Sequence, residues 1–545
     1  MERYLTECNN KISIILRQNP IHKYKQRNHI TQRTIQNLKK KHNIVIKATD
    51  KNLGIAAIDK STYIQEGYNK LNSDNYIKIT QPIPYIKIVK ELIDILIDVN
   101  LLQPSVPIEN INYSLPMNWK QFENNEYFSD LTKLLTFYLS NPKLIKICRF
   151  YIIPKIHKNP IQWREICASP MWITYIASLY IDLCLQPLLQ QIPSYVKNSS
   201  QIVCELDDMQ LPPNCVLLQA DVQSMYPSID TTDGLNALQR ILTKNNFHNE
   251  YKNLLLKLTK WVLTNNYMTF NNETFLQKNG TAMGTPLSVV YACLYLADLE
   301  EKTINNMLYY RLEDPLYYRR LVDDLCGIFS SENTAQLFLN IFHSNAPNNI
   351  NFDFEISLQS TNFLDITIYK SCKFVKTGKL STKLYQKPMN KYLFLPFISQ
   401  HQTSVFTSWI KDYITRICIL CSELIIYKEN LKTFKARLLE RGYTNSFLEK
   451  IFKKLPNRRL LLQKLKQRID INLNPMHTFN TAIILPLDDR TKNLKRQIRN
   501  ALQFTNEFKE EDIHFKQLFS KTATAPMISF KNGRNLQQHL VKSKL

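Results

Sequence analysis

The sequence predicts a mixed α+β protein with an antiparallel centre, and three observations lead to this class. Short apolar runs that suit strands alternate with longer stretches of helical spacing. Two of these strand pairs are joined by turns short enough for hairpins. From about residue 400 onward the chain becomes mainly helical. With an apolar fraction of 44% in 545 residues, we expect globular cores and two to four domains.

The N-terminal part opens with about 40 polar, basic residues and then turns to short strands. NIVIKATDKNLGIAAID (43–59) predicts two strands flanking a loop. Helical spacing follows at 84–103 and again at 168–192, with the strand-like run RFYIIPKI (149–156) before the second helix.

The central part begins with VLLQAD (216–221), a buried-strand run that ends on an acid. NYMTFNNETFLQ predicts a hairpin, because Asn271 and Asn272 lie between two β-prone arms. YYRRLVDDLCGIF (317–329) predicts a second hairpin with Asp323 and Asp324 at its tip. The other expected elements are helices at 232–264, 287–306 and 332–343 and strands at 351–357 and 363–369.

The charge of the chain indicates a polyanionic partner. Lys and Arg number 70 against 46 Asp and Glu, a formal net charge of +24. Nucleic acid is the first candidate and an anionic membrane surface the second, while a merely soluble basic protein is the plain alternative. No signal peptide or membrane-spanning run is visible, and the 11 cysteines are scattered singly. We therefore expect an intracellular protein, nuclear or cytoplasmic and not secreted, with reduced thiols.

Three carboxylates form a candidate metal site. Adjacent Asp323 and Asp324 at a tight turn suit hard divalent cations, although a solvated turn explains most such pairs. Asp221 ends an apolar strand, so its side chain should project from a sheet edge. If that strand lies beside the hairpin, the acids can hold two Mg²⁺ ions roughly 3.5–4 Å apart, as in phosphoryl transfer.

Between these acids, QKNGTAMGTPLSVVYACLYLADLE (277–300) holds two of only nine glycines, Gly280 and Gly284, before a helix that follows Pro286. In order, ADVQSMYPSI, GTAMGTPLS and YRRLVDD resemble motifs A, B and C of the reverse transcriptase palm. The third motif departs from the common retroviral form. It resembles that of Penelope-like retroelements, whose polymerases are close to telomerase.

The resemblance covers about residues 43 to 545. Its further landmarks are KATDKNLG (47–54), YIIPKIHKNP with REICAS (151–169), NFLDITIY (362–369), LYQKP (384–388), RGY (441–443) and PMISFKNGRNLQQHLVKSKL (526–545). The last is similar to the connector that leads into a GIY-YIG endonuclease in longer elements. Because no such nuclease motif appears, the chain resembles the endonuclease-lacking type, or one that stops before the nuclease.

The resemblance implies the right-hand polymerase fold, with an antiparallel palm sheet packed on helices and a mainly helical thumb. The implied divisions are a basic extension (1–42), an N-terminal segment with fingers (43–215), the palm (216–385), the thumb (386–475) and a connector without the endonuclease (476–545).

The resemblance also implies the roles of individual residues. Asp221, Asp323 and Asp324 would be catalytic and hold two Mg²⁺ ions, with Mn²⁺ the alternative and the Val222 carbonyl a further ligand. Tyr226 would exclude a ribonucleotide 2′-OH, with a core tyrosine as the alternative.

For the nucleotide, Lys155 and Arg164 would contact the triphosphate, with Lys158 able to replace Lys155. Gly284, Thr285 and Pro286 would shape the floor beneath the new base pair. Gln277 would contact template or nucleotide, or be a plain surface residue. Tyr385 and Lys387 resemble the primer grip, although solvated strand residues would look the same. Of Arg319 and Arg320, one could reach substrate or an acid while the other is solvated.

The function that follows is an RNA-directed DNA polymerase that adds dNTPs to a 3′-OH primer. Its partners would be an RNA template and a DNA primer, with no membrane. The alternatives are an RNA-dependent RNA polymerase and a catalytically silent nucleic-acid-binding scaffold.

Overall fold

The computed structural model describes residues 40–98, 145–346 and 350–470, apart from a few positions within these ranges, and the backbone of two short strands at 482–486 and 527–531. These last two, β15 (Ala482–Pro486) and β16 (Met527–Lys531), pair in parallel. Most of the predicted basic extension and connector lies outside the described residues. The described chain divides into two compact units, one with residues 44–390 and 420–424 and the other with 391–419 and 425 onward.

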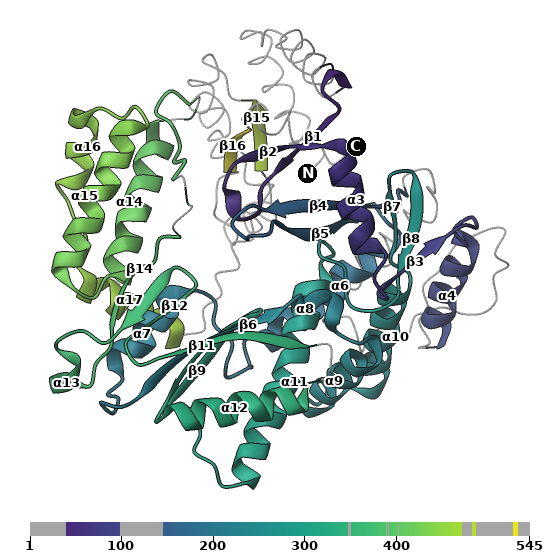
Figure 1. The fold of residues 1–545 in the computed structure, drawn as a ribbon, viewed down its shortest axis with the longest axis horizontal. Helices are drawn as coiled ribbons and strands as arrows, with labels where there is room; N and C mark the ends of the chain where they lie inside the picture. Colours follow the sequence, from purple (N-terminus) through teal and green to yellow (C-terminus); the bar gives the residue numbers. More distant parts are fainter. Residues whose placement is uncertain are drawn as a thin grey trace, which may run out of the picture. The chain divides into compact units, whose positions relative to one another are not determined.

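At the centre of the first unit lies a four-stranded antiparallel sheet with the strand order β11-β6-β10-β9 (Figure 1). Its strands are β6 (Val216–Gln223), β9 (Tyr317–Leu321), β10 (Asp324–Phe329) and β11 (Asn351–Ser357). The predicted strand at 216–221, the hairpin at 317–329 and the strand at 351–357 are confirmed. Their order in the sheet makes β6 an interior strand, between β10 and β11.

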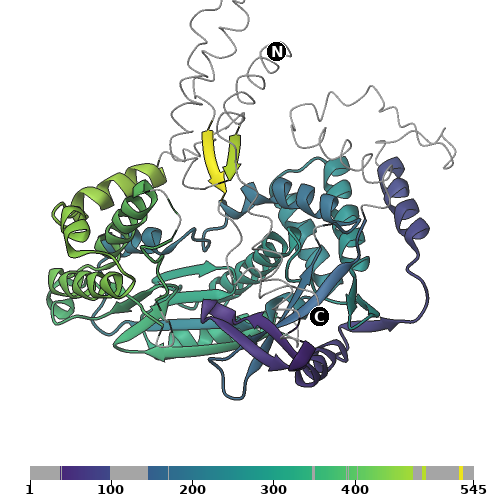
Figure 2. The same ribbon diagram turned by 90° about the horizontal axis from the view of Figure 1, so that it is seen from above.

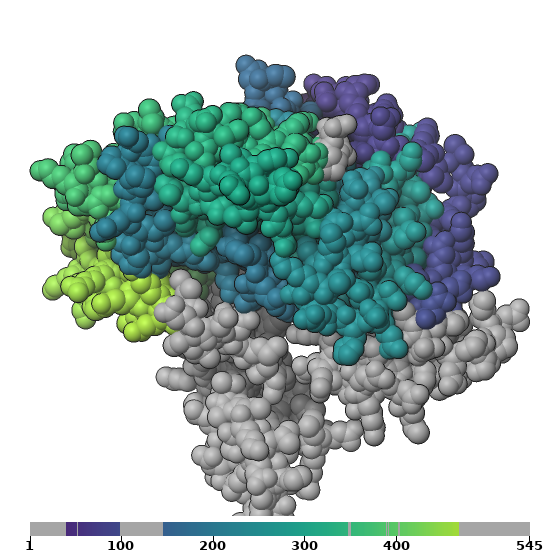
Figure 3. All heavy atoms as spheres, turned by 90° about the horizontal axis from the view of Figure 1, so that it is seen from below, coloured from purple at the N-terminus to yellow at the C-terminus, as the bar shows by residue number. Residues whose placement is uncertain are grey.

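The two faces of this sheet differ. Side chains alternate along a strand, so Val216, Leu218, Ala220 and Val222 share one face of β6, and all four lie in the hydrophobic core. Helices α11 (Leu287–Tyr309) and α12 (Glu332–Asn345) pack on that side, where the α12 region forms a continuous surface (green in Figure 3). Asp221 therefore points to the opposite face, away from the helices.

A second, five-stranded sheet has the order β3-β8-β7-β4-β5. Its strands are β3 (Tyr76–Ile79), β4 (Cys148–Lys155), β5 (Gln162–Ala168), β7 (Tyr267–Phe270) and β8 (Glu273–Gln277). The predicted Asn271–Asn272 turn is confirmed: φ is 46° at Asn271 and 65° at Asn272, the left-handed values that a type I′ hairpin turn requires. A separate pair, β1 (Ile44–Ala48) and β2 (Ile55–Asp59), lies beside β4 (Figure 2).

Helices complete this unit: α3 (Lys60–Leu71), α4 (Tyr85–Asp98), α6 (Tyr175–Leu189), α7 (Ser199–Asp208), α8 (Met225–Ser228), α9 (Thr231–Lys244), α10 (Asn249–Thr264) and α13 (Phe374–Thr377). The helical character expected at 232–264 is confirmed, but as two helices, because the chain breaks between α9 and α10, where Asn246 has a φ of 56°.

The strand expected at 363–369 is also two strands. A turn with Leu364 at φ 55° separates β12 (Ser360–Phe363) from β13 (Ile366–Tyr369), and β14 (Ser381–Leu384) completes a three-stranded sheet.

The second unit is helical in its described part up to residue 470, as predicted. It holds α14 (Thr403–Leu420), α15 (Leu424–Glu440), α16 (Asn445–Phe452) and α17 (Arg458–Asp470). Aromatic rings of Trp409, Phe434 and Tyr443 pack together in its core. No helix in the described residues has the length and apolar character needed to cross a membrane. The mixed α+β class is confirmed, and the division into fingers, palm and thumb stays a prediction.

Candidate active site

Three carboxylates lie in one row across the four-stranded sheet. Asp221 on β6 is the register partner of Asp324 on β10 and, on its other side, of Asp353 on β11. Directly opposed residues of antiparallel strands point to the same face, with Cβ atoms about 4.5–5.5 Å apart. We call Asp221, Asp324 and Asp353 the acidic row. Asp353 was missed in the sequence, because NFDFEIS alternates apolar and polar residues like any half-exposed strand.

Asp323 stands at the end of this row, in the turn of the β9–β10 hairpin. Leu321 pairs with Asp324, so Val322 and Asp323 form a two-residue turn and Asp324 is the first residue of β10. The expectation that both acids sit at the tip is therefore corrected for Asp324. The Asp323 carbonyl accepts a hydrogen bond from the Val222 amide at 3.1 Å, which ties the turn to β6. Val222 is buried, and the predicted ligand role of its carbonyl stays a prediction.

The turn is strained at Val322, whose φ is 58°. A left-handed conformation costs an L-residue other than glycine about 1–2 kcal/mol, and β-branched residues are rare there. Such strain persists only where surrounding contacts hold it.

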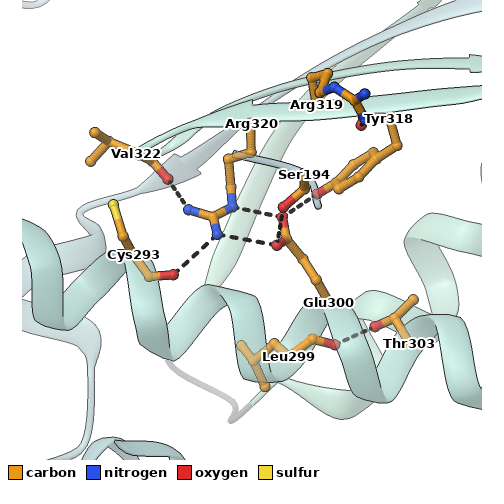
Figure 4. A network of polar contacts seen from close by, with 9 residues as sticks. All are labelled: Ser194, Cys293, Leu299, Glu300, Thr303, Tyr318, Arg319, Arg320 and Val322. Carbon is orange, nitrogen blue, oxygen red and sulfur yellow. Dashed lines mark hydrogen bonds and ion pairs between the residues drawn. The ribbon is translucent and has the colours of Figure 1, made fainter. Parts of the chain in front are cut away.

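Arg320 supplies such a contact (Figure 4). Its side chain is 0% exposed and points from β9 toward α11, where the guanidinium donates to the Val322 carbonyl at 2.9 Å and to the Cys293 carbonyl at 3.1 Å. It also donates to both oxygens of Glu300, at 2.6 and 3.1 Å. The buried fork therefore fixes the hairpin turn to the helix below the sheet.

Glu300 is 4% exposed and accepts further hydrogen bonds from Ser194 at 2.6 Å and Tyr318 at 2.8 Å (Figure 4). Arg319 points to the other side of β9 and pairs with Glu205 at 2.9 Å. Both arginines thus bind carboxylates, and the expectation that one of them would be solvated is wrong.

Burial and mutual repulsion raise the pKa values of these acids. Burial and the carboxylates of Asp323, Asp324 and Asp353 together raise the pKa of Asp221 to about 6. Burial raises the pKa of Asp323, and burial with the Asp323 carboxylate raises that of Asp324. Asp221 is nevertheless exposed over more than a third of its surface, so solvent screens part of this repulsion.

Cations from several segments face these acids. Asp323 interacts electrostatically with Arg164 and Lys155, and Asp324 with Lys387 and Lys51. We call the five cations gathered here the cation cluster: Lys51, Lys155, Lys158, Arg164 and Lys387. Four were predicted from the sequence. Lys51 was not, although it lies in KATDKNLG, one of the motifs that carry the resemblance.

The glycine loop connects two parts of the site through its backbone. Thr281 donates its amide to the Tyr226 carbonyl at 2.8 Å, and the Met283 carbonyl accepts from the Cys167 amide on β5 at 2.8 Å. A Cβ at Gly284 would lie 2.6 Å from the Cys167 carbonyl oxygen, so no side chain fits there. Thr285 donates its hydroxyl to the Ala282 carbonyl at 3.2 Å, and the half-buried Pro286 precedes α11.

Tyr226 lies in the short helix α8, directly after β6. It is half-buried, and burial together with the Asp323 carboxylate raises the pKa of its hydroxyl. Tyr226 therefore packs against the hydrophobic core, while its hydroxyl interacts electrostatically with Asp323.

Gln277 requires a correction. It is 2% exposed, accepts a hydrogen bond from Asn266 at 2.7 Å and donates one to the Asn279 carbonyl at 2.9 Å. It is therefore not a surface residue, and its amide is occupied in holding the start of the glycine loop. Tyr385 is half-buried and donates its amide to the Asp365 carbonyl at 2.9 Å, whereas Lys387 is exposed.

The donor chemistry fits divalent cations. Within the described residues, no ion pair shorter than 4.0 Å neutralises Asp221, Asp323 or Asp324. In the described part of the chain, no group of three or more His, Cys, Asp or Glu side chains is arranged so that it could hold a metal ion by itself. Mg²⁺ commonly binds one or two carboxylates and completes its shell with water and substrate phosphates, which is what this open arrangement permits.

Comparisons with known proteins give one domain family and several polymerases. Residues 393–453, which include α14 to α16, match the family described as the animal helix-turn-helix domain. A stretch of 153 residues is 29% identical to the telomerase reverse transcriptase of Oxytricha trifallax, covering 26% of this chain and 13% of that protein.

Solved structures of low sequence identity also align. Telomerase from Candida albicans in complex with a TWJ fragment of telomeric RNA aligns over 89% of this chain and 72% of its own, with a TM-score of 0.47 and 11% identity. Apo telomerase from Candida tropicalis aligns over 88% and 76%, with a TM-score of 0.40 and 13% identity. The RNA-dependent RNA polymerase of BmCPV aligns over 69% and 33%, with a TM-score of 0.35 and 10% identity.

Proposed function

We propose that this chain is an RNA-directed DNA polymerase of the Penelope-like retroelement type, which extends a 3′-OH primer with dNTPs. The observation that carries the proposal is the pairing of Asp221 with Asp324 across β6 and β10, beside Asp323 and facing the cation cluster. Identity to a telomerase reverse transcriptase supports a nucleic-acid polymerase. The forms of its A, B and C motifs support the Penelope-like type.

In this proposal the acids hold the metal ions and the cations hold the triphosphate. Two Mg²⁺ ions, when bound, would polarise the reacting phosphate and stabilise the attacking and leaving oxygens. Asp221 and Asp323 would hold them with Asp324 as the third ligand. Lys155 would contact the triphosphate as a point charge, and Arg164 as a planar fork.

Tyr226 would select the sugar. Its hydroxyl interacts electrostatically with Asp323, and a bulky ring at this position would leave no room for a 2′-OH on the incoming nucleotide. The backbone bond from Thr281 to Tyr226 would hold this ring against the glycine loop. Gly284, Thr285 and Pro286 would form the floor beneath the new base pair, and Tyr385 and Lys387 would approach the primer.

An RNA template annealed to a DNA primer would be the nucleic-acid partner, inside the cell. The basic run at 450–468 suits contacts with duplex phosphates. Each such contact contributes a slope of about −0.9 in log K against log salt for duplex DNA, so binding should weaken steeply with salt.

Primer extension tests the proposal. Purified protein receives an RNA template with a DNA primer, Mg²⁺, and either dNTPs or rNTPs. We expect extension with dNTPs that EDTA abolishes and that the Asp323→Ala/Asp324→Ala double variant lowers at least about 100-fold. Glu313→Ala/Asp314→Ala is the matched control, because it removes an adjacent acidic pair that is exposed and outside the site.

Two other outcomes would contradict the proposed activity. Extension with rNTPs alone indicates an RNA-dependent RNA polymerase. No extension, combined with tight and salt-sensitive binding of the same duplex, indicates a silent scaffold.

A further inference from the structure

The turn between β1 and β2 carries two charged residues that the proposed reaction has not used, Asp50 and Lys51. They lie in a 3₁₀ turn, Asp50–Asn52. The turn is closed at its ends, because both the amide and the hydroxyl of Thr49 donate to the Gly54 carbonyl at 3.1 Å. Leu53 is 5% exposed and anchors the turn from within. The backbone of Asp50 and Lys51 is therefore held in place by these contacts.

The carboxylate of Asp50 is buried, although hydrogen bonds from the described chain do not stabilise both of its oxygens. The residue is 7% exposed, and its Oδ1 lies 3.4 Å from a terminal nitrogen of Arg164 on β5. Its Oδ2 is also buried and has no hydrogen-bond partner among the described residues. A buried carboxylate oxygen without a donor is unfavourable. The carboxylate is instead stabilised by nearby cations. It forms an ion pair with Arg164 and also interacts electrostatically with Lys51 and Lys155.

Arg164 itself is held from one side only. Its side chain is 42% exposed, and within the described chain it makes no second ion pair and no side-chain hydrogen bond. The guanidinium is therefore oriented by Asp50 and keeps its remaining N–H groups for another acceptor.

Lys51 is strained and points among other cations. Its φ is 57°, the left-handed region that residues other than glycine avoid, and strain of this kind gathers at functional sites. Its ammonium interacts electrostatically with Lys387, Lys158 and Arg164. On the other side it faces Asp221 and Asp324.

Asp50 offsets only part of the cost of this placement, so an added polyanion would stabilise it. Loss of solvent and repulsion by Lys387 lower the pKa of Lys51, and Lys155 is affected in the same way by burial and Arg164. An exposed lysine in an ordinary surface turn would swing away from such neighbours into water. A chain of phosphates is the ligand whose charge and length match several cations beside a carboxylate metal site.

We propose that Lys51 is a polyphosphate-binding residue and that Asp50 is the positioning residue for Arg164, so that the Asp50–Asn52 turn forms one wall of the site for the triphosphate of the incoming nucleotide. This assignment deepens the proposed polymerase function and rests on it for the identity of the ligand. The turn would make its contribution from an element outside both sheets that carry the predicted site residues.

Binding of inorganic tripolyphosphate in EDTA tests Lys51 without any catalysis. We expect Lys51→Ala to raise the dissociation constant for tripolyphosphate, measured by calorimetry, roughly tenfold. The dissociation constant of Lys51→Arg should stay near the parent value. The control is Lys60→Ala, an exposed lysine at the start of α3. If Lys51 only neutralises the acidic row, tripolyphosphate binding stays unchanged in Lys51→Ala, and the proposal is overturned.

Steady-state extension then tests the role in the reaction. Lys51→Ala should raise KM for dNTP roughly tenfold while the dissociation constant of the primer–template stays the same. Asp50→Asn should raise KM for dNTP, because Arg164 is no longer held in position. It should not weaken tripolyphosphate binding, because it also removes a negative charge from the cation cluster. Asp50→Glu should restore part of the affinity for dNTP.

A general folding defect in Asp50→Asn would weaken both measurements together, and an unchanged KM for dNTP would overturn the positioning role. If Asp50→Asn does not fold, Asp50→Ser provides the same comparison, because it also removes the carboxylate that holds Arg164. If the parent extends no primer, the proposed function fails, whereas the tripolyphosphate measurement still decides whether Lys51 binds polyphosphate.

Discussion

Replacing Arg320 should separate stability from activity. In Arg320→Met, Glu300 stays buried at 4% exposure without its cation, and the carbonyls of Val322 and Cys293 lose their donor. Removing one partner of a buried ion pair costs about 3–5 kcal/mol. Since a folded domain is stable by only about 5–15 kcal/mol, a large part of the free energy of unfolding should be lost. The neighbouring Arg319→Met is the control, and its half-exposed pair with Glu205 should cost no more than about 1 kcal/mol.

The double variant Arg320→Met/Glu300→Gln sharpens this test. It removes both charges. The Gln oxygen accepts from one of the two hydroxyls of Ser194 and Tyr318, and the other hydroxyl can accept from the amide NH₂, so most of the lost stability should return. Val322 still lacks the donor that holds its left-handed conformation. We therefore expect primer extension to remain low, by about 100-fold, because a small displacement of reacting groups costs that much.

Urea unfolding and primer extension on the same preparations provide the two readouts. A loss under about 1 kcal/mol in Arg320→Met would refute the view that the buried pair supports the fold. Parent-level extension by the folded double variant would refute the view that Arg320 positions the Asp323 turn.

Three further predictions concern the acids, the glycine loop and the sugar. Because the pKa of Asp221 is raised to about 6, the folded chain binds the proton more tightly than the unfolded one, and stability falls as pH rises from about 4 to 6. In metal-free buffer, Asp221→Asn should therefore be about 1 kcal/mol more stable than the parent at pH 7.5, after allowance for solvent screening, and about equal at pH 4. Gly284→Ala should cost about 1–3 kcal/mol more than Gly54→Ala in urea unfolding, because the two glycines share a φ near +124° but only Gly284 has a backbone atom, 2.6 Å away, in the path of the Cβ. Tyr226→Val should raise the use of rNTPs relative to dNTPs at least about tenfold, measured as a ratio of kcat/KM.

Each of these three predictions has a result that would contradict it. An Asp221→Asn advantage that is the same at pH 4 and pH 7.5 would show that carboxylate crowding is not its cause. Equal losses in the two glycine variants would remove the close approach to Cys167 as an explanation. An unchanged nucleotide ratio in Tyr226→Val would make this tyrosine a packing residue.

The sequence predicted those site residues that lie in short, recognisable sequence motifs. An apolar run ending on Asp221, a glycine loop before a helix and an acidic pair between two strand-like runs are local signals, and the structure pairs Asp221 with Asp324. Asn271 and Asn272 are a similar case, because left-handed φ values favour asparagine. Each of these depends on neighbours within a few residues.

What the sequence could not predict depends on distant pairing. Asp353 joins the acidic row only because β11 lies beside β6, a choice made by the sheet and not by NFDFEIS. Glu300 follows LADL on a helix and resembles a solvated acid until Arg320 reaches it from β9. Asp50 belongs to a polar turn whose burial becomes visible only with β5 in place.

The position of β6 between β10 and β11 has a consequence for synthesis on the ribosome. β6 ends at Gln223, whereas β10 begins at Asp324 and β11 at Asn351. The apolar run at 216–220 therefore has two unpaired edges while the intervening helices are synthesised. Unpaired edges of an apolar strand recruit other strands. Nascent or truncated chains that end before β10 should therefore aggregate, or require a chaperone, more than chains that extend past residue 357.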